Sequence, residues 1–168
     1  MLRVHARLLL ISSLFLVAQY TVAQTQDKLF EGNSVLELAL SGEMHELLMD
    51  RGNDPQYHAL ELTYKDTDGK PLRLSVKVKA RGHFRKLKEN CKYPPLLLNF
   101  SKESSENTLF DNQDKLKLVT PCQGDKYVVY EYLVYKIYNL ISPMSFNVRL
   151  VKMTFENFNN KGKDSEPM

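Results

Sequence analysis

The residues of this 168-residue chain best suited to chemistry are basic, and they are concentrated in one short segment. Residues 71–92 carry eight lysines and arginines against a single acidic residue, Glu89. From Leu72 to Arg81 apolar residues alternate with four basic residues and Ser75, which predicts a half-buried strand with a cationic outer face. Because like charges on one face repel each other, acidic neighbours or an anionic ligand must offset them. An anion-binding site and a merely solvated strand face are both compatible with this pattern.

Other familiar chemical motifs are absent from the sequence. It contains no glycine-rich dinucleotide fingerprint, no P-loop, no His-Glu-x-x-His and no Cys-x-x-Cys. His45, His58 and His83 lack the spacing of metal ligands, so we interpret them as structural or exposed side chains. A Ser/His/Asp triad cannot be assigned from dispersed residues. We therefore predict no metal site, and the catalytic residues, if the chain has any, stay unknown.

The first residues have the layout of a secretory signal peptide. Arg3 and Arg7 precede an uncharged run from Leu8 to Ala18, and the small residues up to Ala23 offer a cleavage point. A membrane anchor is the alternative, but Gln19 interrupts the run well short of the ~20 apolar residues that a spanning helix needs. We predict a signal peptide over 1–23 and export to the periplasm, the cell surface or the medium.

The net charge of +3 hides an uneven distribution. Without residues 1–23 the chain has 21 basic and 20 acidic residues, but residues 24–70 carry 4 basic against 10 acidic ones. The total is too small to favour nucleic acid as a partner. We expect no membrane span after cleavage. An exported protein substrate or an anionic surface ligand is the kind of partner that we expect.

The two cysteines, Cys91 and Cys122, are the only ones in the chain. Disulfides persist in the oxidising compartments that exported proteins reach. A bridge would close a loop of about thirty residues and contribute roughly 3–4 kcal/mol in the chain-entropy account. We favour the bridge over the alternative of two buried free thiols.

The remaining pattern predicts one α+β domain over 24–155, followed by a polar tail over 156–168. Its sheet should be mixed or mostly antiparallel, with a short helix over 41–50 capped by Ser41 and a long, largely buried helix over 126–141. Residues 101–107 read as a polar loop. Strands are predicted at residues 34–40, 58–64, 72–81, 96–100, 116–119 and 145–155.

This order of elements resembles the N-terminal half of the CotH family, the spore-coat-type atypical protein kinases, and is most similar to their exported bacterial branch. The resemblance covers about residues 34–155. It rests on a strand ending Val78-Lys-Ala-Arg-Gly82, the basic loop after it, and the apolar strand Pro95 to Phe100. The strand Asp114 to Val119, the long helix and the strand Val148 to Lys152 complete it.

The resemblance implies a lobe that binds ATP with Mg²⁺ or Mn²⁺ and takes part in phosphoryl transfer to an exported protein. It assigns the anion or nucleotide contacts to one set of residues: Lys79, Arg81, Arg85, Lys86, Lys92 (an approximate match) and, on the long helix, Glu131. The acidic residues that hold metal belong to the family's later half, and the chain ends before it. We therefore expect a truncated lobe that is inactive alone. The alternative is a non-catalytic exported module that recognises an anionic partner.

Overall fold

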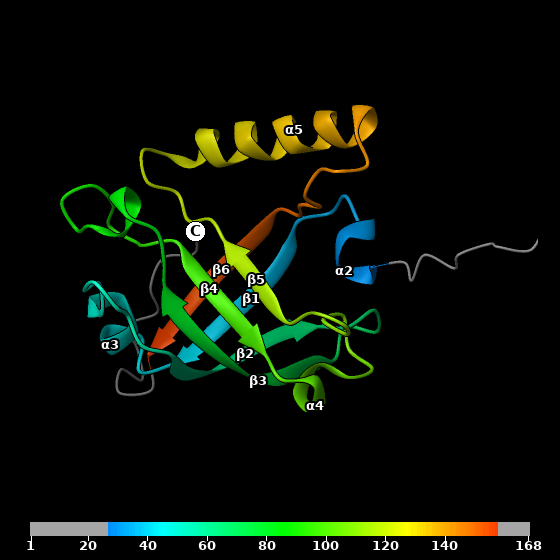
Figure 1. The fold of residues 1–168 in the computed structure, drawn as a ribbon. Helices are drawn as coiled ribbons and strands as arrows, with labels where there is room; N and C mark the ends of the chain where they lie inside the picture. Colours follow the sequence, from blue (N-terminus) through cyan, green and yellow to red (C-terminus); the bar gives the residue numbers. More distant parts are fainter. Residues whose placement is uncertain (1–26, 158–168) are drawn as a thin grey trace, which may run out of the picture.

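A computed structural model describes residues 27–157 as a curled sheet with four short helical segments and one long helix (Figure 1). The predicted signal peptide and residues 158–168 of the predicted tail lie outside the described residues. The elements are α2 (Lys28–Glu31), β1 (Leu36–Gly42), α3 (Met44–Met49), β2 (His58–Lys65), β3 (Pro71–Ala80), η1 (Phe84–Lys86), β4 (Leu96–Phe100), α4 (Lys102–Ser105), β5 (Lys115–Leu118), α5 (Asp125–Ile141) and β6 (Val151–Asn157).

The six strands form one mixed sheet in the order β5-β4-β3-β2-β1-β6. All neighbours are antiparallel except β1 and β6, which pair in parallel with Leu36 beside Val151. The first and last strands of the domain are thus neighbours, and β5 and β6 are the two edges. The predicted α+β class with a mixed sheet is confirmed.

The alternating residues of β2 and β3 make a hairpin, as predicted. Leu62 pairs with Leu74 on the core face, while Arg73, Ser75 and Lys77 point to solvent. Between the strands, Gly69 adopts a φ of +78°, a conformation that residues with a side chain rarely adopt. The Asp66 carboxylate accepts backbone hydrogen bonds within this turn, which fixes its path.

The core lies on one face of the sheet and continues into the loop before β5. Phe110 is 2% exposed, stacks on Phe100 at 5.0 Å between ring centroids, and meets the edge of Tyr64 at 5.4 Å. The Tyr64 hydroxyl accepts a hydrogen bond from the Leu109 backbone N–H, so the buried phenol is satisfied. Met44 and Leu47 of α3 join the same cluster.

Three local predictions are wrong. Ser41 does not cap α3: it belongs to β1, and its hydroxyl donates to Glu156 of β6 at 2.9 Å. The loop predicted over 101–107 contains α4, whose N-cap Ser101 accepts from the Ser104 N–H. The last strand begins at Val151 rather than residue 145 and extends to Asn157, into the predicted tail. In each case a tertiary contact or a local side-chain bond overrides the pattern.

The long helix forms where it was predicted, but its predicted burial is wrong. No residue of α5 is buried, and Leu140 is 88% exposed. The helix crosses the end of the curled sheet and joins the edge strands β5 and β6 (Figure 1). Within residues 27–157, no helix has the length and apolarity needed to cross a bilayer.

Candidate anion-binding surface

Four lysines occupy the outer face of the sheet where β3, β4 and β5 lie side by side. Lys77 is level with Asn99 of β4, which is level with Lys115 of β5. One step along, Lys79 is level with Leu97 and then with Lys117. Residues directly across antiparallel strands project from the same face, so all four ammonium groups share one surface. We call Lys77, Lys79, Lys115 and Lys117 the lysine surface.

The spacing of this surface follows from strand geometry. Neighbours two apart on a strand are about 7 Å apart, and β3 and β5, separated by one strand, are about 10 Å apart. The four lysines therefore mark the corners of a rectangle of roughly 7 by 10 Å at the level of the backbone. The polar amide of Asn99 lies in one row and the half-buried Leu97 in the other. Such an array can contact several anionic groups of one ligand at once.

Most of the lysine surface lacks an acidic partner. Between residues 27 and 157, no carboxylate lies within 4.0 Å of Lys77, Lys79 or Lys117, whereas Lys115 pairs with Asp114 at 3.4 Å. Aromatic rings flank two of the lysines: Lys79 Nζ is 4.8 Å from the Tyr57 ring centroid, and Lys117 Nζ is 5.2 Å from that of Phe146. These contacts orient the ammonium groups without neutralising them.

The basic loop, residues 81–95 between β3 and β4, differs from the lysine surface, because two of its cations form bonds within the protein. Lys86 is 9% exposed and its Nζ donates to the Gly52 carbonyl. Arg85 Nη2 donates to the Thr120 carbonyl at 2.6 Å, and its Nη1 lies 4.0 Å from the Glu131 carboxylate on α5. The loop therefore uses these two cations to bind neighbouring segments.

Arg51 binds the basic loop from the other side, and no pattern in the sequence pointed to this role. Its guanidinium donates to the carbonyls of Leu48 at 2.6 Å, Cys91 at 2.8 Å and Lys92 at 2.6 Å. Partial burial lowers the pKa of this guanidinium from its usual value, but the group stays charged at neutral pH. One side chain thus joins the end of α3 to the loop that precedes β4.

The predicted disulfide is confirmed: Cys91 and Cys122 are bonded. Cys91 is 2% exposed, and the bridge ties the basic loop to the segment between β5 and α5. Beside it, Thr120 is buried and its hydroxyl donates to the Tyr93 carbonyl at 3.0 Å. The bridge and the Arg85 contacts therefore hold the start of α5 against the sheet.

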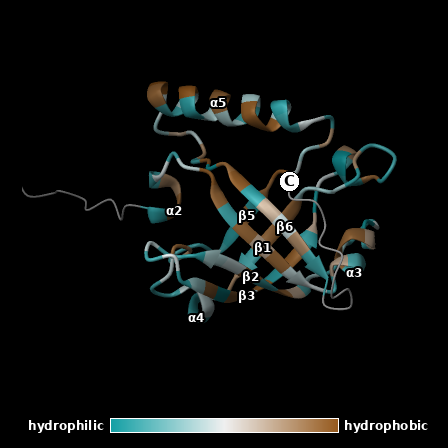
Figure 2. Ribbon diagram, turned by 180° about the vertical axis from the view of Figure 1, so that it is seen from behind, coloured by the Kyte–Doolittle hydropathy of each residue, from teal (hydrophilic) through white to brown (hydrophobic). Residues whose placement is uncertain are grey.

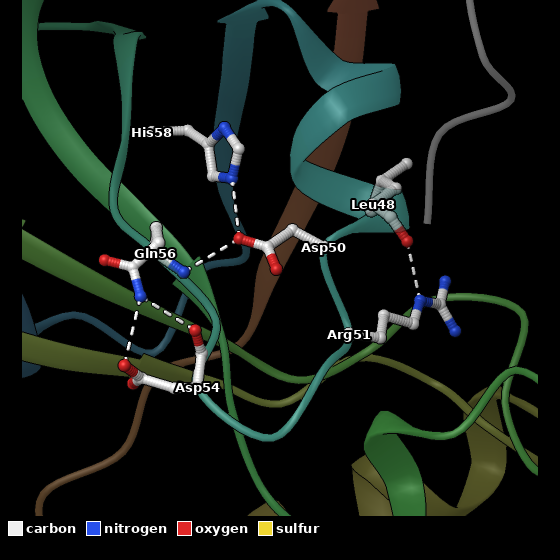
Figure 3. Close-up of polar contacts among 6 residues, drawn as sticks. All are labelled: Leu48, Asp50, Arg51, Asp54, Gln56 and His58. Atoms are coloured by element: carbon white, nitrogen blue, oxygen red, sulfur yellow. Dashed lines mark hydrogen bonds and ion pairs between the residues drawn. The ribbon is translucent and has the colours of Figure 1, made fainter.

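A second polar cluster closes the loop between α3 and β2 (Figure 3). The Asp50 carboxylate accepts from the Gln56 backbone N–H at 2.8 Å and lies 3.1 Å from His58 Nε2. The Gln56 hydrogen bond, followed by the one with His58, lowers the pKa of Asp50 from its ordinary value. These bonds give the Asp50 carboxylate a structural role in fixing the loop.

The six site residues named from the sequence fall into separate places. Arg85 and Glu131 are brought together, whereas Lys86 turns toward Gly52. Lys92 is exposed, with its Nζ 5.2 Å from the Tyr93 ring. The Arg81 backbone N–H extends the β3–β4 pairing to the Pro95 carbonyl. Of the six, Lys79 alone belongs to the lysine surface.

Sequence reasoning missed Lys115 and Lys117 as partners of the β3 cations. The sequence does contain a pattern that indicates them: from Lys115 to Leu118, basic and apolar residues alternate, much as polar and apolar residues do in β3. Without the strand order, nothing placed this short strand beside β4. No group of three or more histidine, cysteine or acidic side chains within 27–157 could hold a metal ion.

An apolar groove of about 270 Å³ lies between the two edge strands and α5. Its apolar lining comes from the end of β5, the start of β6 and one side of the helix: Leu118, Val119, Leu150, Val151, Val128 and Val129. None of the four lysines lines this groove, so the groove and the lysine surface are separate sites.

Comparison of the chain with protein-family models, with curated proteins and with solved structures gave no match.

Proposed function

We propose that this chain is an exported, non-catalytic module that binds an anionic polymer or an acidic protein through the lysine surface. The observation that carries the proposal is the set of four lysines aligned across β3, β4 and β5, three of them without an acidic partner in the described part of the chain. The disulfide supports export, because such bonds persist in oxidising compartments.

The chemistry of the surface favours a ligand with repeated negative charges. A single small anion cannot span a rectangle of roughly 7 by 10 Å, whereas successive charges along a polymer can meet several lysines. The ammonium groups are exposed point charges, so binding should depend strongly on salt and weakly on the exact anion. Lys115 contributes less than the others, since Asp114 already offsets its charge.

The test measures binding of dextran sulfate by isothermal titration calorimetry at 50 and 150 mM NaCl. The fourfold variant Lys77→Gln, Lys79→Gln, Lys115→Gln and Lys117→Gln should weaken binding at least tenfold at 50 mM NaCl. A matched control changes four exposed lysines elsewhere to glutamine: Lys28, Lys65, Lys70 and Lys102. Both variants lose the same net charge, so only position distinguishes them. Equal losses in the two variants would overturn the proposal.

A second candidate function is a kinase-like lobe that contributes nucleotide contacts to a longer protein. The ion pair between Arg85 and Glu131 favours it, because it brings together two of the residues to which the resemblance assigns nucleotide contacts. On this view the chain alone binds ATP with Mg²⁺ or Mn²⁺ but transfers no phosphate. Phosphoryl transfer needs metal and phosphate positioning that a basic lobe alone lacks.

Thermal unfolding separates the two candidates. The kinase-like lobe predicts a higher melting temperature with millimolar ATP and Mg²⁺ or Mn²⁺, and loss of that shift in Arg85→Gln. Dextran sulfate should raise the melting temperature if the lysine surface is the binding site. A shift with dextran sulfate and none with ATP and either metal would exclude the nucleotide-binding candidate.

A further inference from the structure

The exposed side of α5 is more apolar than its half-buried side, the opposite of an ordinary surface helix. The half-buried side is mixed: it holds Val128, Tyr132 and Tyr135 together with every charged or amide residue between Tyr127 and Ile141, namely Glu131, Lys136 and Asn139. The exposed side between the same residues is entirely aliphatic or tyrosine: Tyr127, Val129, Tyr130, Leu133, Val134, Ile137, Tyr138, Leu140 and Ile141. A surface helix normally turns its apolar side inward.

Hydrophobic residues colour much of α5 (Figure 2), and its exposed side is large enough for a stable interface. Exposed fractions run from 40% at Val129 to 88% at Leu140, and Met144 and Phe146 just beyond the helix are 92% and 68% exposed. Large side chains bury roughly 150–250 Å² each, so the patch exposes on the order of 1,000 Å². The largest apolar patch of a monomer is about 300–600 Å², whereas one partner of a standard interface buries about 800 Å².

The spacing on this side is that of a helix-packing seam. Tyr127, Tyr130, Val134, Ile137 and Ile141 follow one another at intervals of three, four, three and four residues. This periodicity keeps one stripe facing a neighbouring helix along the whole length of about 25 Å. The stripe carries no charge, so a copy of the same stripe can pack against it without burying an unpaired ion.

We propose that α5 forms an antiparallel pair with α5 of a second copy of this chain. A two-fold axis at Val134, midway between Tyr127 and Ile141, brings the identical stripes together and sets opposite ends of the helix dipoles side by side. A bilayer surface is the less suitable partner, because interfacial helices carry a strongly basic polar side. The inference does not rest on anion binding, and the lysine surface is on other elements.

Sedimentation velocity of the exported chain from 1 to 200 μM tests the proposal. The expected result is a dimer at the higher concentrations. Val134→Glu with Ile137→Glu should weaken dimerisation at least 100-fold. The matched control, Phe84→Glu with Leu87→Glu, also charges two exposed apolar residues but lies in the basic loop. It should remain dimeric, and circular dichroism should show both variants folded.

Engineered cysteines test the antiparallel arrangement. Val134→Cys lies at the axis and should cross-link to its own copy on oxidation, whereas Tyr127→Cys lies seven residues from the axis and should not. A parallel pair would cross-link both variants, which would overturn the arrangement. A monomeric wild-type chain at 200 μM would overturn the proposal as a whole. Sedimentation of that monomer with phosphatidylcholine vesicles would assign the exposed side of α5 to lipid instead.

Discussion

The apolar residues of the sheet are buried, whereas most of those of α5 are exposed. In β3 the alternation of Leu74, Val76 and Val78 with polar residues is matched by burial, since each of the three is 5% exposed or less. In α5 six of the seven aliphatic residues are exposed, all except Val128, whereas Glu131, Lys136 and Asn139 are half-buried. The sheet forms its core within residues 27–157, whereas α5 is anchored at its start, through the disulfide and the Arg85 contacts.

This difference teaches that apolar composition alone does not place a helix in a core. A strand exposes its pattern directly to both faces of a sheet, so alternation predicts which residues are buried. A helix with apolar residues on a wide sector is buried only where another surface covers it. The contrast predicts that substitutions of similar size have large effects in the sheet core and small ones on α5.

The largest effect is expected from Phe110→Ala. The ring is fully packed against Phe100 and Tyr64, and its removal should lower the free energy of unfolding by about 3–5 kcal/mol. Leu140→Ala, at an 88% exposed position, should change it by less than about 0.5 kcal/mol. Urea unfolding at 1 μM protein measures both. Similar losses in the two variants would remove the contrast between sheet and helix.

Removal of the disulfide comes next. The variant Cys91→Ala with Cys122→Ala removes the bridge between cysteines 31 positions apart and should lower the free energy of unfolding by about 3–4 kcal/mol. Because the bridge holds the start of α5, faster amide hydrogen exchange should appear at Tyr127 and Val128 than in β3. Exchange that rises equally in the helix and in β3 would argue against this anchoring role.

Arg51→Ala should have a smaller but clear effect. It removes three donors from the carbonyls of Leu48, Cys91 and Lys92, and should cost about 1.5–3 kcal/mol because hydrogen bonds to a charged donor are lost. The matched control is Arg73→Ala, whose exposed ion pair with Glu61 at 3.6 Å should contribute no more than about 1 kcal/mol. Chemical denaturation at neutral pH measures both losses of stability. Equal losses would contradict the role of Arg51 in joining α3 to the basic loop.

The smallest effect concerns Asp50, whose pKa is lowered from its ordinary value by the bonds from Gln56 and His58. A lowered folded-state pKa stabilises the protein above the unfolded-state pKa, and that contribution is lost as pH falls through the lowered value. Asp50→Asn should therefore be less stable than wild type at pH 5–7, with the difference shrinking toward pH 3. Urea unfolding of both proteins across this range measures the difference, and a difference that stays constant from pH 7 to pH 3 would contradict this role of Asp50.

Much of the sheet could be predicted from particular residues. The alternation from Leu72 to Arg81 located β3, and the compact apolar run from Leu96 to Phe100 located β4 with both bounds correct. The segment from residue 145 misled, because Phe146 and Val148 alternate with polar residues yet lie outside any strand. Phe146 instead covers Lys117, a contact between residues far apart in sequence that periodicity does not encode.

The candidate site was only partly predictable. The alternation around Lys77 and Lys79 indicated a cationic strand face. Lys115 and Lys117 lie on the same face only because β5 pairs with β4. The charges of Arg85 and Lys86 suggested ligand contacts, whereas the folded chain turns both toward backbone carbonyls. A sequence gives the charge of a side chain, but the acceptors near it depend on which loops meet.

By itself the sequence determined local properties: the strand periods, the extent of the long helix, the cationic face of β3 and the presence of only two cysteines available to pair. Only the tertiary structure decided which strands are neighbours, and hence that four lysines share one surface. It also decided that the apolar side of α5 faces outward. The physical reason is that periodicity is a property of a few consecutive residues, whereas burial and charge pairing depend on surfaces brought together from distant parts of the chain.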